Sequence, residues 1–332
     1  MRKRGAIEIQ FNWILILVAG AAIIAIFIGF ISKQQGISAV STNILIASSL
    51  DAVLHGYEGT DISDAIEMPK SKVSFNCGSF SVDGISRQIW QLSLFSPAAL
   101  ETDKLLLLSF GWDMPYRIAN FVYLTSPDAR YIFIGNSYFA RKMFEKMRGK
   151  ARIDGFTNVQ AIEDENDVAV RIIFFGQSPE IPESLKSSAI TSLMVDGDEN
   201  SGIIEFFDLV DGKFEPRGKS YYFGEASLFG AVFSENIGMY TCNMEKAFNK
   251  LKIISRIYNK KVNNIIKQYN STEQNNVCNI FYQSNSDKIL GSISYLSSLD
   301  FQSSNYEDII KAADEIKKAN SGADALSCIL VY

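Results

Sequence analysis

The chain has 332 residues and a mass of 37.0 kDa, with 47% apolar and 21% charged side chains. This apolar content is enough to build a core, which excludes a disordered chain, a collagen-like fibre and a small disulfide scaffold. The formal net charge of −5 argues against nucleic acid as a partner, because phosphate binding requires a basic surface.

The first element in chain order is an apolar segment over residues 11–31, in which Asn12 is the most polar side chain. As a helix it is about 30 Å long, the hydrocarbon thickness of a bilayer. The basic residues at 2–4 predict that residues 1–10 form a cytoplasmic N-terminus. A cleaved signal peptide has a shorter apolar region. We therefore predict a single-pass signal-anchor in the cell membrane, with the lipid bilayer as a partner and the rest of the chain outside.

Small residues recur every fourth position within this segment, at Ala21, Ala25 and Gly29. Such a row lets a second helix approach closely, so it predicts self-association through the membrane helix. Ordinary composition of a membrane helix explains the same row, and both interpretations stay open.

The residues before the apolar segment resemble those of a known class. Arg4-Gly5-Ala6-Ile7-Glu8 followed by an apolar helix resembles the processing region of archaeal type IV pilin-like and class III signal proteins. The run from Gly5 to Ile14 also resembles the start of uncharacterised archaeal single-pass membrane proteins. The first resemblance implies a filament subunit, and the second implies a membrane setting without site residues.

A connector over residues 32–70 follows. Leu50 and Leu54 belong to an apolar row of helical spacing, which predicts a short amphipathic helix, and the turn-rich stretch from Gly56 to Pro69 predicts a loop. The extracytoplasmic domain is predicted over residues 71–332.

Strand-like and helix-like runs alternate in the first part of this domain. Residues 137–148 predict a helix between two strands, and hence a βαβ unit with a parallel part of the sheet. Asp211-Gly212 favours a hairpin turn, and hence an antiparallel part. The predicted strands are 72–75, 89–95, 105–110, 131–134, 168–175, 190–195, 203–209 and 220–223.

The last third is predicted to be helical over residues 239–320. Apolar side chains spaced by three or four residues from Met244 to Tyr269 predict one long amphipathic helix. A second helix is predicted over 280–299 and a third from Asn305, before a final strand over 326–331. The predicted fold class is therefore α/β: an N-terminal transmembrane helix, a mixed-sheet outer domain and a helical C-terminal third.

Four cysteines, an even number, lie in the part predicted to be outside the membrane, where disulfides persist. Their spacing contains no C-x-x-C pair, so it indicates neither a zinc site nor a redox motif. Cys242 and Cys278 are the candidate disulfide pair, provided that the chain folds back or the helix breaks near Asn263. Other pairings with Cys77 and Cys328, and buried free thiols, remain open.

One run has the spacing of a calcium loop. Asp196, Asp198 and Asn200 match the first three alternate ligand positions, whereas Ser201 and Phe207 occupy positions that normally hold glycine and glutamate. An acidic turn between two strands explains the same residues. Calcium is thus the one cofactor considered, and no other is predicted.

Three further features bear on chemistry. His55 is the sole histidine, which excludes a histidine-rich metal site. Gly135 precedes a predicted helix start where an anion can bind, although Ser137 also fits a plain N-cap. Asn270 begins a glycosylation sequon, predicted to lie in a polar loop.

No catalytic constellation is present in the sequence. The leading hypothesis is therefore a membrane-anchored extracytoplasmic binding or structural protein of the cell envelope. Two alternatives are a pilin-like filament subunit and an anchored hydrolase-type enzyme. The hydrolase predicts a deep polar cleft near Gly135, at a point where α/β sheets often bind ligands. The binding or structural partner itself is not identified.

Overall fold

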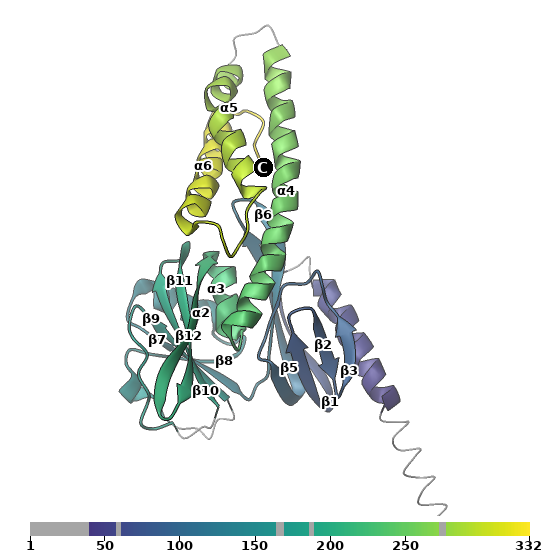
Figure 1. Cartoon of the computed structure of the whole chain (residues 1–332), viewed down its shortest axis with the longest axis vertical. Helices are drawn as coiled ribbons and strands as arrows, with labels where there is room; N and C mark the ends of the chain where they lie inside the picture. The colour runs from purple at the N-terminus through teal and green to yellow at the C-terminus, as the bar shows by residue number, and fades with distance from the viewer. Residues whose placement is uncertain (1–39, 58–60, 164–168, 186–188, 272–276) are drawn as a thin grey trace, which may run out of the picture.

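The computed structural model describes residues 40–57, 61–163, 169–185, 189–271 and 277–332. Figure 1 shows two sheets side by side and a helical arm that rises from between them. The strands are β1 (Ile62–Asn76), β2 (Ser79–Val82), β3 (Ile85–Gln88), β4 (Leu94–Phe95), β5 (Ala99–Asp113), β6 (Arg117–Thr125), β7 (Ala129–Ile134), β8 (Arg152–Phe156), β9 (Ala169–Phe175), β10 (Ile190–Gly197), β11 (Ser201–Val210) and β12 (Lys213–Phe223). The helices are an N-terminal one over 40–56, α2 (Tyr138–Met147), η2 (Val159–Ala161), α3 (Gly224–Phe233), α4 (Ile237–Ser271), α5 (Val277–Leu296) and α6 (Tyr306–Ala325).

The first sheet has the order β3-β2-β1-β5-β6-β4 and is antiparallel except where β4 joins β6. One of its faces carries the N-terminal helix, whose Leu50 and Leu54 are buried against Val73 and Leu107. The predicted amphipathic helix of the connector is therefore present. The predicted loop after it is wrong from Ile62 onward, because pairing with β5 extends that stretch into strand β1.

The second sheet has the order β12-β11-β10-β9-β7-β8. Strands β8, β7, β9 and β10 run parallel, and β10, β11 and β12 pair antiparallel, as predicted. Helix α2 connects β7 to β8 in a βαβ unit, which confirms the predicted motif, but its second strand β8 was missed: the next predicted strand, 168–175, is β9. Asp211 and Gly212 both have positive φ, as a tight hairpin between β11 and β12 requires.

Helix α3 lies between the two sheets and is buried from Ala226 to Phe233. Its Phe229 packs on Phe110 of the first sheet, and its Phe233 packs on Tyr131 of the second. A helix that is apolar all round is expected in such a position. One continuous core therefore joins both sheets, α3 and the base of α4.

Helices α4, α5 and α6 form the arm. The buried face of α4 includes Met244, Phe248 and Leu251, which confirms the predicted long helix. Residues 326–331 were predicted as a strand, but this is wrong: 326–327 form a turn, and the residues after it pair with no strand. They are held between helices, since Tyr282 donates to the carbonyl of Ile329 and the Ile329 amide donates to Tyr269.

The predicted fold class is corrected in two respects. The architecture is mixed α/β with a helical C-terminal third, but it contains two separate sheets instead of one mixed sheet. In the described ranges, no helix combines the length and the apolar character that crossing a membrane requires. The segment 11–31, predicted as the span, falls outside the described residues, as do Ala21, Ala25 and Gly29.

Candidate functional site

A cleft of about 890 Å³ lies where the chain passes from the first sheet to the second. It lies at the amino ends of the parallel strands β7, β9 and β10, facing the start of β5 and the residues after α3. Its lining includes apolar and charged side chains, among them Leu100, Tyr131, Arg171, Ile190, Thr191 and Asp208.

Sheet register places four of these side chains in one row. Tyr131 pairs with Arg171, Arg171 with Thr191, and Thr191 with Asp208, across four neighbouring strands. Residues paired in register project from the same face of a sheet. The row faces α3, because Arg171 bonds to α3 and Tyr131 packs on it.

Arg171 is the central side chain of this row and is only 6% exposed. Its guanidinium donates to Thr191 Oγ1 and to the carbonyls of Ala231 and Glu235, each at 3.1 Å. The Ala231 carbonyl belongs to the last turn of α3, where the helix dipole favours a cation, and Glu235 follows the C-cap of that helix. The ring of Phe206 lies 5.3 Å from the guanidinium carbon. Burial lowers the pKa of Arg171 to about 10, so the group is charged at neutral pH.

The charge of Arg171 is not paired within the described part of the chain. No carboxylate there lies within ion-pair distance of it, and its Nε is buried without a hydrogen-bond partner. An unpaired buried charge is costly, and a buried donor without an acceptor adds to that cost.

Other charged side chains around the cleft have partners in the described ranges, apart from the exposed carboxylate of Asp128. Lys70 lies 3.4 Å from Glu101 at the rim. Arg130 Nε donates to Asp154 at 2.6 Å, and Arg217 Nε donates to Asp208 at 2.8 Å. The carboxylate of Glu235 accepts a hydrogen bond from the Ala98 amide. Arg171 is therefore the buried charge of the cleft that stands apart from these pairs.

Tyr131 at the edge of the row gives the cleft a pH-dependent contribution to stability. Its hydroxyl lies 2.8 Å from Thr125 Oγ1, and burial raises its pKa to about 12. Because the pKa of Tyr131 is higher in the folded state than in the unfolded state, its contribution to stability is fully present below about pH 10. This contribution is lost as the pH rises through about 12.

We expect Tyr131→Phe to reduce the alkaline loss of stability. Between about pH 9 and 11 the free energy of unfolding should fall by about 1.4 kcal/mol less in the variant than in the parent, as measured by urea unfolding at each pH. Tyr138→Phe is the control, because Tyr138 is 76% exposed and should leave the pH dependence unchanged. Equal alkaline losses in the parent and in Tyr131→Phe would contradict the assignment.

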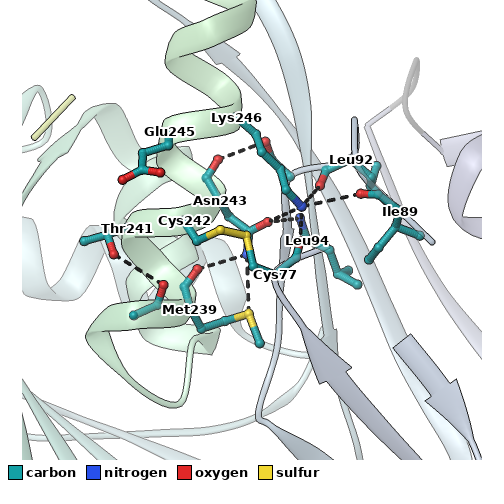
Figure 2. Close-up of a disulfide and its surroundings, with 12 residues drawn as sticks. Cys77, Ile89, Leu92, Leu94, Met239, Thr241, Cys242, Asn243, Glu245 and Lys246 are labelled. Carbon is teal, nitrogen blue, oxygen red and sulfur yellow. Dashed lines mark hydrogen bonds between the residues drawn. A yellow bond between two sulfur atoms is a disulfide. The ribbon is translucent and has the colours of Figure 1, made fainter. Parts of the chain in front are cut away.

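A second polar cluster fixes the base of the arm to the first sheet. Figure 2 shows the disulfide between Cys77, which follows β1, and Cys242 on α4, with a Cα–Cα distance of 6.0 Å. Next to it, the ammonium of Lys246 donates to the carbonyls of Cys77, Ile89 and Leu92. Burial lowers the pKa of Lys246 to about 8.

Asn243 extends this cluster toward the cleft. Its side-chain oxygen accepts from the Leu94 amide at 3.2 Å, and its backbone carbonyl accepts from Ser93 Oγ at 3.2 Å. Strand β4 therefore has a fixed position against α4. The next residues, 96–99, form one wall of the cleft and bond to Glu235. The disulfide cluster thus holds together elements that carry two walls of the cleft.

The disulfide prediction needs correction. All four cysteines are bonded, but Cys77 pairs with Cys242 and Cys278 pairs with Cys328, so the predicted Cys242–Cys278 bridge is wrong. Helix α4 continues without a break to Ser271 and separates Cys242 from Cys278 along its length. Both observed bridges join segments that the fold brings side by side.

The residues of the calcium prediction lie in the turn between β10 and β11. Asp198 Oδ1 accepts from the amides of Asn200 and Ser201, at 2.8 and 3.2 Å, as in an acidic turn. Asp196 pairs with Ile203 in the hairpin. No group of three or more His, Cys, Asp or Glu side chains in the described ranges is arranged to hold a metal. The calcium site at Asp196, Asp198 and Asn200 stays a prediction.

The other residues considered as candidate sites lie at separate places in the fold. Asn270 is exposed, but it lies in the last turn of α4 and not in the predicted loop, and its side chain accepts from Gln283. Ser137 caps α2 by accepting from the Ala140 amide at 3.0 Å. Gly135 lies at the carboxyl end of β7, whereas the cleft lies at the amino end, so the predicted location of a cleft is wrong. His55 is exposed on the N-terminal helix near Asp51.

Sequence reasoning did not identify Arg171, although it is the one charged residue in the apolar run from Ala169 to Phe175. A charge inside a strand that is buried on both faces is a usable signal, since such strands are normally apolar throughout. No known family model, curated protein or solved structure matches the chain.

Proposed function

We propose that this chain is an extracytoplasmic binding protein of the cell envelope, and that the cleft between its two sheets holds a small molecule. The observation that carries the proposal is the cleft itself. At about 890 Å³ it falls in the range of small-molecule sites. It also has their usual composition, in which apolar walls surround a few fixed polar groups.

The two disulfides support the extracytoplasmic setting. They use every cysteine of the chain and join residues 165 and 50 positions apart. Disulfides of this kind form and persist in oxidising compartments and are rare where glutathione keeps thiols reduced.

The compartment is tested by trapping the thiols of intact cells. Cells that make the chain are treated with a membrane-permeant alkylating reagent before lysis, and the unreduced peptides are then mapped by mass spectrometry. We expect linked Cys77–Cys242 and Cys278–Cys328 peptides without alkylation. Recovery of all four cysteines in alkylated form would contradict the proposed compartment.

Binding in the cleft is tested by a screen of neutral and charged fragments with ligand-observed NMR. We expect a set of fragments whose binding is lost in Val210→Trp, because this half-buried residue lines the cleft and a tryptophan there fills it. Val277→Trp is the matched control, because Val277 is 51% exposed on the arm. If no fragment is sensitive to Val210→Trp, the cleft is not a binding site.

A further inference from the structure

We infer that the molecule bound in the cleft is a monocarboxylate with an apolar body, and that its carboxylate pairs with the guanidinium of Arg171. This inference rests on the proposed function and names its ligand class. It follows from the charge of the cleft wall, the shape of the guanidinium and the apolar surface beside it.

The charges at the cleft favour a single negative group on the ligand. Asp208, Glu101 and Glu235 each have a partner, as described above, and so do Lys70 and Arg217. Arg171 is the buried cation of the cleft with no carboxylate at ion-pair distance in the described ranges, and the carboxylates of Glu235 and Asp208 act on it only from further away. One positive charge without an ion pair in a low-dielectric wall attracts a monoanion, and a second negative charge on the ligand would meet Asp208 and the exposed Asp128 without a cation of its own.

The guanidinium is already held in position. Three acceptors on Thr191, Ala231 and Glu235 fix its plane, so a ligand need not order a flexible side chain. Its Nε–H is unpartnered and is itself buried in the cleft wall, so a carboxylate that pairs with this edge displaces part of the lining. A guanidinium edge is suited to a carboxylate, whose two oxygens accept parallel N–H bonds.

The apolar part of the ligand follows from the neighbouring lining. Phe233 of α3 and Ala129 of β7 are buried side chains that line the cleft on the face of Arg171, and Val210 is half-buried on the same face. Burial of apolar ligand surface against them favours a molecule with a hydrocarbon chain or ring.

The inference is tested with hexanoate, hexanamide and inorganic phosphate, using titration calorimetry on the full chain. We expect hexanoate to bind about tenfold or more tightly than hexanamide, because a charged pair contributes more than about 1.4 kcal/mol. Phosphate should bind more weakly than hexanoate. Equal binding of hexanoate and hexanamide would overturn the carboxylate, and tighter binding of phosphate would overturn the monocarboxylate class.

Two variants of Thr191 with side chains of equal shape separate the effect of an added negative charge from the effect of the changed side chain. Thr191→Asp places a carboxylate beside Arg171 and should bind hexanoate about tenfold or more weakly than Thr191→Asn, which differs from it only in the charge. These variants keep Arg171, which also caps α3, so the fold is not at risk. Equal hexanoate affinities for Thr191→Asp and Thr191→Asn would overturn the role of Arg171.

Failure of the inference and failure of the proposed function have different outcomes. If Val210→Trp abolishes binding of neutral fragments while hexanoate does not bind, the binding function stands and the carboxylate class is wrong. If no probe or fragment depends on Val210, both are wrong.

Discussion

Replacing both Cys77 and Cys242 with alanine is expected to lower the free energy of unfolding by about 5 kcal/mol. The bridge closes a loop of 165 residues, and the chain-entropy relation gives this value for a loop of that length. The bridge also holds the base of α4 against the first sheet beside the carbonyls bound by Lys246. Urea unfolding monitored by far-ultraviolet circular dichroism, under non-reducing conditions, measures the effect.

The second disulfide supplies a matched control for location. Replacing Cys278 and Cys328 with alanine removes the bridge that closes a loop of 50 residues. It is expected to lower the free energy of unfolding by about 4 kcal/mol, a similar amount. Its effect should be confined to the arm, so binding of cleft fragments should survive below the unfolding transition. The Cys77 and Cys242 variant should weaken that binding, because the walls formed by 96–99 and Glu235 are held by α4. If both double variants affect the cleft equally, the cluster of Figure 2 does not position it.

The helical arm and the parallel strands were predictable from the sequence because their patterns are local. The apolar row of α4 identifies a helix within a few turns, and the apolar runs Tyr131–Ile134 of β7 and Ile172–Phe175 of β9 identify strands within a few residues. The cap at Asn305 is local as well: its side chain accepts from the Glu307 amide, where the third helix was predicted to begin.

Elements that depend on distant partners were missed. Strand β6 contains Asn120, which interrupts its apolar run but is buried and bonded to Ser109 of the neighbouring strand. The stretch 89–95 was predicted as a strand from its mostly apolar residues, yet only Leu94–Phe95 forms one, because the carbonyls of Ile89 and Leu92 are bound by Lys246 of α4. In both cases contacts between residues far apart in the sequence decide the structure, and the neighbouring residues in the sequence do not reveal these contacts.

The candidate site could not be predicted from the sequence for the same reason. The cleft combines the start of β5, the amino ends of three strands from the second sheet and the end of α3. No two of these segments adjoin in sequence. The disulfide partners were likewise undetermined, since four cysteines allow three pairings and only the folded topology selects one.

Trp112→Ala is expected to destabilise the protein by about 5 kcal/mol or more. Trp112 is 1% exposed, stacks on Phe121 at a centroid distance of 5.1 Å and donates through Nε1 to the carbonyl of Phe223 at 2.8 Å. Loss of the ring leaves a cavity costing about 3–5 kcal/mol, and the orphaned carbonyl adds about 1–3 kcal/mol. Trp112 also touches Phe248, so it links the first sheet, the second sheet and α4.

Trp90 supplies the control for this variant. It is 70% exposed, and Trp90→Ala should change the free energy of unfolding by no more than about 0.5 kcal/mol. Trp112→Phe should cost about 2 kcal/mol, because the ring volume is mostly kept while the hydrogen bond to Phe223 is lost. Urea unfolding of the three variants measures these changes in the free energy of unfolding, and we expect the loss to be largest for Trp112→Ala and smallest for Trp90→Ala. If Trp112→Ala unfolds as the parent does, the two sheets do not share a core at this residue, and the cleft between them has no rigid frame.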